Sequence, residues 1–74
     1  MLKKKPKKIY QPCRYTDDGT DIRYGDIPER LYSWQVFSSP DEARQWLRDN
    51  NYNPDEFAMI AYEPEDIEDY QIIF

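Results

Sequence analysis

The feature that most limits what this chain can fold into is a helix start at Ser39. Pro40 stands at the first helical position, and Asp41 and Glu42 follow it, with Glu42 three residues after the serine. This order is typical of a capping box, in which the serine oxygen accepts a hydrogen bond from a backbone N–H that the first turn leaves free. Acidic side chains in the first turn also suit the helix dipole. The pattern predicts a helix over residues 40–50.

The apolar residues of this segment recur at helical spacing. Ala43, Trp46 and Leu47 occupy positions i, i+3 and i+4, so they share one face of the helix. Asn50 and Asn51 follow them, and asparagine tolerates the left-handed conformation that often ends a helix. We therefore expect one helix that packs on a sheet through Trp46 and Leu47.

The remaining patterned segments favour short strands. Residues 9–16 and 20–24 flank an Asp-Gly turn, which predicts a β-hairpin. Residues 31–37 alternate in polarity, which predicts a strand with one covered face. Residues 57–62 are apolar on both faces, as a central strand requires, or a strand sandwiched between the helix and a partner. Residues 70–74 end the chain as a last strand.

Two details sharpen this prediction. Pro12 has no backbone N–H, so the first strand should lie at a sheet edge or break in two. Tyr32, Trp34 and Val36 should share the covered face of their strand. The predicted class is α+β: an antiparallel or mixed sheet of about four to five strands, in the order ββ-β-α-β-β, with one helix packed on one face.

Charge is distributed unevenly along the chain. All five lysines precede residue 9, and no acidic residue precedes Asp17. From residue 9 onward fifteen acids face five arginines, a net charge of −10. We expect residues 1–8 to be a disordered basic arm and residues 9–74 to be a single small α+β domain. The lysines are Lys3, Lys4, Lys5, Lys7 and Lys8.

Several classes of chemistry lack the residues that they need. The chain has no histidine, which removes Ser-His and Cys-His catalysis and most zinc sites. The acidic turn of residues 17–21 does not have the spacing of an EF-hand, and two glycines cannot form a glycine-rich phosphate loop. We therefore expect no catalytic residues, no cofactor and no bound metal.

Cys13 is the only cysteine, so no internal disulfide can form, as is usual in a reducing compartment. No apolar run approaches the roughly 20 residues that cross a bilayer. The basic start is not followed by the apolar core of a signal peptide. These features predict a cytoplasmic protein without a membrane partner.

A strongly anionic body repels nucleic acid and attracts basic protein surfaces. Residues 63–69 contain five acids, and tyrosines supply rigid amphipathic rings that suit protein interfaces. Asp26 and Glu29 would extend this surface if the hairpin folded beside the last strand. A solvated connector is the alternative interpretation of residues 63–69. The candidate partner-binding residues are Asp17, Asp18, Asp21, Glu63, Glu65, Asp66, Glu68, Asp69, Tyr62 and Tyr70.

The function favoured by these features is non-enzymatic binding to a basic surface of another protein. In size and charge the chain resembles small acidic inhibitors of phage or mobile-element type that mimic nucleic acid. One alternative is a nucleic-acid-associated accessory protein that contacts phosphates through the lysines of residues 1–8. Those lysines could equally be a solubilising tail. Another alternative is a small subunit of a larger complex. The oligomeric state and the identity of the partner stay open.

Overall fold

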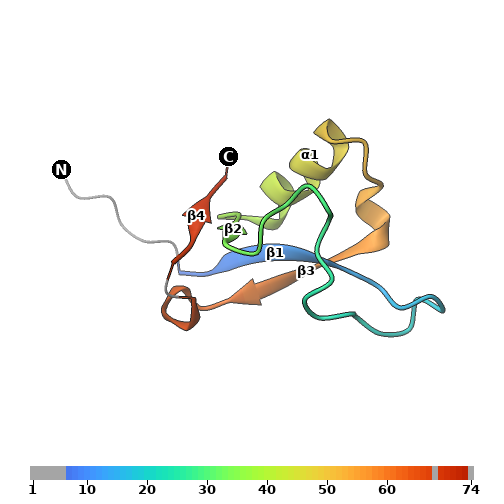
Figure 1. Ribbon diagram of the computed structural model, residues 1–74, viewed down its shortest axis with the longest axis horizontal. Helices are drawn as coiled ribbons and strands as arrows, with labels where there is room; N and C mark the ends of the chain where they lie inside the picture. The colour runs from blue at the N-terminus through green and yellow to red at the C-terminus, as the bar shows by residue number, and fades with distance from the viewer. Residues whose placement is uncertain (1–6, 68, 74) are drawn as a thin grey trace.

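The computed structural model describes residues 7–67 and 69–73, which form one α-helix, two short 3-10 helices and two sheets of two strands each (Figure 1). The predicted α+β class is confirmed. The four to five strands expected in one sheet are instead four strands in two sheets. Predictions that concern residues 1–6, Glu68 and Phe74 lie outside the described residues.

The larger sheet joins two segments that are far apart in the sequence. Strand β1 (Ile9–Arg14) runs antiparallel to β3 (Phe57–Tyr62), with Ile9 opposite Tyr62 and Arg14 opposite Phe57. Strand β3 has the predicted bounds, and of the two predicted alternatives it is not a central strand: within the described residues β1 is its only neighbour. The more deeply buried strand is β1, because the chain before α1 also packs against it.

Pro12 lies inside β1 without breaking the strand. Tyr10 exchanges backbone hydrogen bonds of 2.8 and 2.9 Å with Phe37, and the Arg14 N–H donates to the Asp26 carbonyl at 2.9 Å. Backbone groups alternate in direction along a strand, so position 12 faces the same side as positions 10 and 14, away from β3. The missing N–H therefore removes no bond between β1 and β3. Of the two predicted alternatives, β1 is a continuous strand of a two-stranded sheet and does not break.

The predicted hairpin is reduced to its turn. Gly19 has φ of 72° and its N–H donates to the Thr16 carbonyl at 2.8 Å, so the Asp-Gly turn is confirmed. Residues 20–24 form no strand, and a single bridge between Tyr15 and Ile22 is all that remains of the pairing. The chain that returns from the turn forms backbone hydrogen bonds to β1 only at Arg14, the last residue of the strand. Beyond this point it runs away from β1.

The second sheet is much smaller. Strand β2 (Gln35–Val36) runs parallel to β4 (Gln71–Ile72). The strand predicted over residues 31–37 is therefore wrong for its first half. Tyr32 and Trp34 are 63% and 42% exposed, and their rings stack on each other with centroids 5.3 Å apart. The Gln35 N–H donates to the Tyr32 carbonyl at 2.9 Å, which closes a turn where the alternation predicted extended chain.

Two contacts link the sheets. One is the backbone bridge between Tyr10 and Phe37. The other is the buried Gln11 side chain, whose Nε2 donates to the carbonyls of Ser33 at 2.9 Å and Gln35 at 3.0 Å. The amide side chain thus satisfies carbonyls that a longer backbone ladder would otherwise have bonded.

Helix α1 (Pro40–Asp49) confirms the predicted start and ends one residue before the predicted end, with Asn50 as its C-cap. The Ser39 side chain accepts from the Glu42 N–H at 3.3 Å, and Asn51 adopts a left-handed φ of 66° after the helix. The box is not reciprocal, because the Glu42 carboxylate accepts a hydrogen bond from the Ser38 hydroxyl instead. No helix in the described part of the chain has the length and apolar character needed to span a bilayer.

The core lies between α1 and the strands. Ala43 and Leu47 are fully buried, whereas Trp46 is only half-buried and packs beside Phe37 and Tyr52. Leu31, Phe37 and Ala43 form the centre of a hydrophobic cluster. The predicted face of the helix therefore packs on the core, with Ala43 and Leu47 at its centre and Trp46 at its margin.

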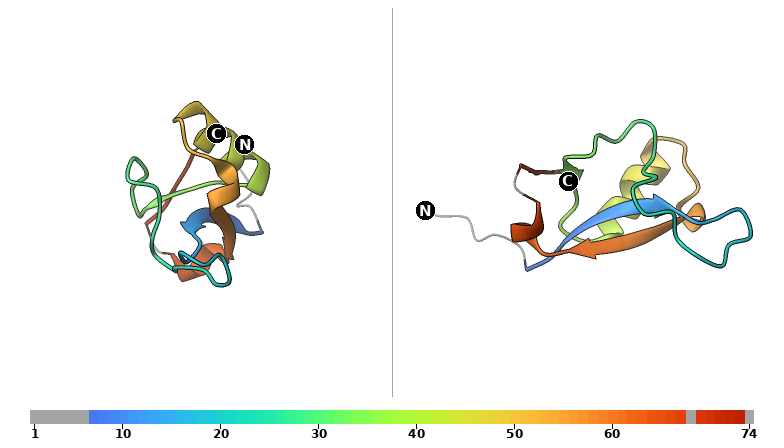
Figure 2. Two further views of the ribbon diagram at one scale, coloured as in Figure 1. Left: turned by 90° about the vertical axis from the view of Figure 1, so that its right-hand side faces the viewer. Right: turned by 60° about the horizontal axis from the view of Figure 1, so that its bottom comes forward.

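The antiparallel pairing sets the two ends of the molecule. The 3-10 helix η1 (Pro54–Glu56) lies beside the end of β1, and η2 (Pro64–Asp66) lies beside its beginning (Figures 1 and 2). Six paired residues separate these ends by roughly 17 Å. Everything attached to one end is therefore remote from the other.

Candidate functional site

The predicted partner-binding acids fall into two groups at opposite ends of the larger sheet. The first group lies in the loop that follows β1, and the second lies in and around η2 (Figure 2). The hairpin does not fold beside the last strand, so the acids do not form one continuous surface. The first group is Asp17, Asp18 and Asp21, and the second is Glu63, Glu65, Asp66 and Asp69.

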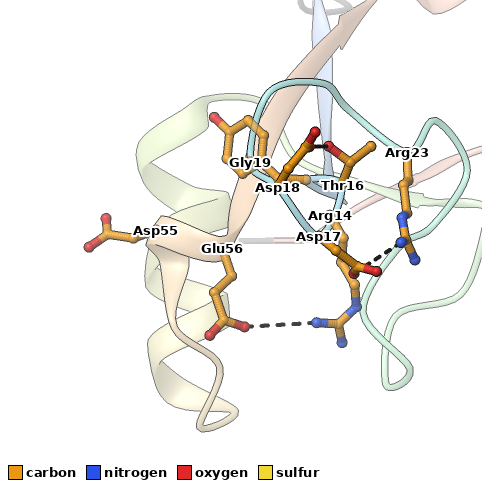
Figure 3. A pocket seen from close by; sticks show the side chains of 9 residues that line it. Arg14, Thr16, Asp17, Asp18, Gly19, Arg23, Asp55 and Glu56 are labelled. Atoms are coloured by element: carbon orange, nitrogen blue, oxygen red, sulfur yellow. Dashed lines mark hydrogen bonds and ion pairs between the residues drawn. The ribbon is translucent and has the colours of Figure 1, made fainter.

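Asp17 and Asp18 of the first group border an open pocket of about 460 Å³ between the loop and η1, whereas Asp21 lies outside its lining (Figure 3). We call it the acidic pocket. Two of its carboxylates belong to η1, the segment between the helix and β3 for which the sequence offered no candidate binding residue. Only the pairing of β1 with β3 brings that segment beside the loop. The lining residues are Arg14, Tyr15, Thr16, Asp17, Asp18, Gly19, Arg23, Asp55 and Glu56.

Local signals shape the η1 wall of the pocket. Asn53 caps η1 by accepting a hydrogen bond from the Asp55 N–H at 3.1 Å, and Pro54 follows as the first helical residue. Asp55 and Glu56 therefore occupy the first turn, where the N–H groups favour acidic side chains. Both are exposed, and Asp55 points away from the arginines of the pocket in Figure 3. The Asn-Pro-Asp-Glu order was a signal in the sequence that could have identified this turn.

Asp18 stabilises the loop after β1, which forms one wall of the acidic pocket. Its carboxylate accepts hydrogen bonds from the Thr16 hydroxyl at 2.6 Å, the Thr20 hydroxyl at 2.9 Å and the Thr20 N–H at 3.2 Å. The bond from Thr16, followed by those from Thr20, lowers the pKa of Asp18 to about 2. The negative charge is thus part of the loop structure at neutral pH.

The other two acids of the loop also have local partners. Asp17 pairs with Arg23 at 3.0 Å across the exposed loop. Asp21 accepts a hydrogen bond from the Ile22 N–H at 2.8 Å. These contacts fix the directions of the carboxylates before any partner binds.

Arg14 lies at the centre of the charge network. Its Nη2 donates to both oxygens of Glu29 at 2.8 and 3.0 Å, and Asp26 and Glu56 lie 4.0 Å from the guanidinium. The guanidinium carbon also lies 4.7 Å from the ring centroid of Phe57, so a cation–π interaction adds to the ion pairs of Arg14. One arginine thus orients three carboxylates.

Glu29 has further partners. The Tyr52 hydroxyl donates to Glu29 Oε2 at 3.0 Å. The pKa of Glu29 is lowered, first by a hydrogen bond from its own backbone, then by the Tyr52 hydroxyl and by Arg14. Asp26 and Glu29 therefore adjoin the acidic pocket through Arg14 without lining it. They would have extended the surface of residues 63–69 only if the hairpin had folded beside the last strand.

The pocket and the partners of Arg14 are strongly anionic. Six carboxylates face two guanidinium groups, a net charge of −4. At the opposite end the exposed Lys7 and Lys8 precede Ile9, which pairs with Tyr62, so they lie at the same end as η2. Positive charge therefore offsets the second acidic group more than the first. The six carboxylates belong to Asp17, Asp18, Asp26, Glu29, Asp55 and Glu56.

The two tyrosines predicted to contact a partner are less accessible than expected. Tyr62 and Tyr70 are half-buried, and burial raises the pKa of Tyr62. Tyr15 is 39% exposed and lines the acidic pocket, so it is the aromatic ring that this surface presents. Sequence reasoning did not select Tyr15, because its neighbours predicted a paired strand.

Cys13 is buried in β1, and burial raises the pKa of its thiol. Within residues 7–67 and 69–73, no three His, Cys, Asp or Glu side chains are grouped so as to hold a metal ion. The acidic pocket instead presents oriented carboxylates and one aromatic ring at an open surface, an arrangement that suits Lys and Arg side chains.

No family model matches the chain, and the comparisons with curated proteins and with solved structures find no match either. Function must therefore be inferred from the residues of the surface themselves.

Proposed function

We propose that this chain is a binding module that docks on a basic surface of another protein through the acidic pocket. The observation that carries the proposal is the net charge of −4 that six carboxylates and two arginines leave at this end of the molecule. Lys7 and Lys8 lie at the other end and do not neutralise it. An uncompensated charge of this size steers a basic partner toward the pocket.

The geometry of the pocket supports this role. Asp18 and Glu29 are held by hydrogen bonds, whereas Asp55 and Glu56 are exposed and can accept new ones. A preorganised surface loses little conformational entropy when a partner binds. Tyr15 adds a ring whose apolar face a partner can cover.

A protein that binds phosphates through Lys and Arg side chains would meet carboxylates here in place of phosphates. We therefore infer that the module acts as a small acidic inhibitor, of the phage or mobile-element type, by competing with nucleic acid for such a surface. Its work is binding and not catalysis. A free Cys13 in the core fits a reducing cytoplasm.

A second candidate function concerns the lysines. Lys7 and Lys8 are exposed, and within the described residues no carboxylate lies within 4.0 Å of their amino groups. Exposed lysines at this end of the sheet could contact phosphates as a nucleic-acid accessory protein does. The module could also dock on a larger complex as one of its small subunits.

The test is capture of a partner from extract of the native cell by the tagged chain. One variant, Asp55→Asn with Glu56→Gln, removes two charges from the acidic pocket. The matched control, Glu63→Gln with Glu65→Gln, removes two exposed charges from the other end. We expect the first variant to release the captured protein at lower salt and the control to behave like the parent chain.

Equal loss in both variants would mean that only total charge matters and would contradict a site at the acidic pocket. Recovery of nucleic acid instead of protein, lost when residues 1–8 are deleted, would support the second candidate function.

A further inference from the structure

A second recess lies between α1 and the chain beside it at Phe37 and at Ile73, the residue after β4, with a volume of about 410 Å³. We call it the helix groove. It shares no residue with the acidic pocket, so what it binds is a question beyond the proposed function. Its lining residues are Phe37, Glu42, Gln45, Trp46, Asp49 and Ile73.

The floor of the helix groove is apolar and preformed. Phe37 is fully buried, and the Trp46 ring lies tilted against it with centroids 6.0 Å apart. The Ile73 N–H donates to the Val36 carbonyl at 2.8 Å, which fixes the backbone of the third wall. A recess of this size and polarity suits one large apolar side chain.

The rim of the groove carries one sign of charge. Glu42 and Asp49 are its charged members, and no cation is present among the described lining residues. The arginines of the helix occupy a different stripe, where Arg44 pairs with Asp41 at 3.1 Å. The helix therefore presents carboxylates to the groove and keeps its cations on another face. Charge complementarity calls for Lys or Arg on the occupant.

The edge of β4 adds a third property. The N–H groups of Gln71 and Ile73 donate to the carbonyls of Trp34, the residue before β2, and of Val36 in β2. The backbone groups of Ile72 between them therefore face away from β2. Within the described residues β4 has no second neighbour, so an extended chain can pair with this edge.

From these three properties we propose that the helix groove binds an extended peptide segment with one large apolar side chain flanked by Lys or Arg. The apolar side chain enters the recess over Trp46, the cations face Glu42 and Asp49, and the peptide backbone pairs with the edge of β4.

The test is an NMR titration of the full isotope-labelled chain with the capped peptide Lys-Lys-Leu-Lys-Lys. We expect the indole N–H of Trp46 and the amide of Ile73 to shift. The same peptide with Ser in place of Leu should shift them at least several-fold less. Asp49→Asn should weaken binding about two- to fivefold, as loss of one exposed ion pair does.

Two matched variants locate the effect. Asp41→Asn removes the same charge from the same helix outside the groove and should change affinity less than twofold. Asp55→Asn with Glu56→Gln alters the acidic pocket and should leave the groove shifts unchanged, so failure here is distinguishable from failure of the proposed function.

Three results would overturn the proposal. Equal binding of the Ser peptide would reduce the interaction to charge alone. Dependence of the Trp46 signal on protein concentration would indicate a second copy as the occupant. A shift of that signal on deletion of residues 1–6 would indicate that the chain's own basic segment occupies the groove.

Discussion

Arg14 shows how one residue can organise a surface. Its guanidinium bonds to both oxygens of Glu29, lies within 4.0 Å of Asp26 and Glu56, and rests over Phe57. Its side chain is 26% exposed, so these interactions are less screened than those of a fully exposed ion pair. Without this cation, three carboxylates would repel one another across the end of β1.

The variant Arg14→Met retains an apolar stem over Phe57 and removes the charge. We expect it to lower the free energy of unfolding by roughly 1–2 kcal/mol, because charged hydrogen bonds are lost and the carboxylates repel. Arg23→Met is the control and should stay within about 0.5 kcal/mol, since its pair with Asp17 is exposed. Urea unfolding curves measure both, and equal losses would mean that Arg14 has no special role.

Asp18 provides a pH-dependent test at the same scale. Its pKa falls from 3.8 to about 2 because Thr16 and Thr20 donate to the carboxylate. A lowered native pKa stabilises the folded loop above pH 3.8, and that contribution is lost as the pH falls through about 2. An NMR titration of the Asp18 carboxyl carbon should show this midpoint. In Thr16→Val it should rise toward 3.8, and an unchanged midpoint would contradict the assigned cause.

At the scale of elements, the helix was predictable because its signals are local. Ser39 and Glu42 lie three residues apart, and Ala43 and Leu47 lie one turn apart, so neighbours in the sequence determine the start and the buried face. The bounds of β3 were predictable for the same reason, since six consecutive apolar residues mark a strand.

Strand pairing was not predictable, because no local signal joins β1 to a strand more than 40 residues later. The Asp-Gly pair predicted the turn at Gly19 correctly, but the returning strand of the hairpin does not form, and no local signal showed that β1 pairs with β3. The alternation of Tyr32 and Trp34 is also compatible with an exposed aromatic stack, which burial alone distinguishes from a strand. The acidic pocket could not be predicted for the same reason, because Asp55 and Glu56 reach it only through the pairing of β1 with β3.

Leu47→Ala should lower the free energy of unfolding by about 2–5 kcal/mol, because the side chain is fully buried on the core face of α1. Ser39→Ala should lower the free energy of unfolding by about 1 kcal/mol, because the hydrogen bond that caps the start of α1 is lost. Arg48→Ala, exposed on the same helix, should change stability by less than about 0.5 kcal/mol. Thermal unfolding followed by circular dichroism measures all three. A Leu47→Ala chain as stable as the parent would contradict the packing of α1.

At the scale of the whole molecule, the antiparallel β1 and β3 separate charge along the sheet. The described lysines lie with η2, and the acidic pocket lies at the far end. At physiological ionic strength charges are screened over about 8 Å, which is less than the separation of the two ends. Among the described residues a partner therefore meets two different surfaces, and the one around the acidic pocket is the more strongly anionic.

An NMR titration of the labelled chain with tetralysine in low salt tests this asymmetry most directly. We expect the largest shifts at Thr16, Asp18, Gly19 and Glu56, with smaller shifts around Glu65, and loss of the former as salt rises. Largest shifts around Glu63, Glu65 and Asp66, or no preference between the two ends, would contradict the acidic pocket as the docking surface for a basic protein.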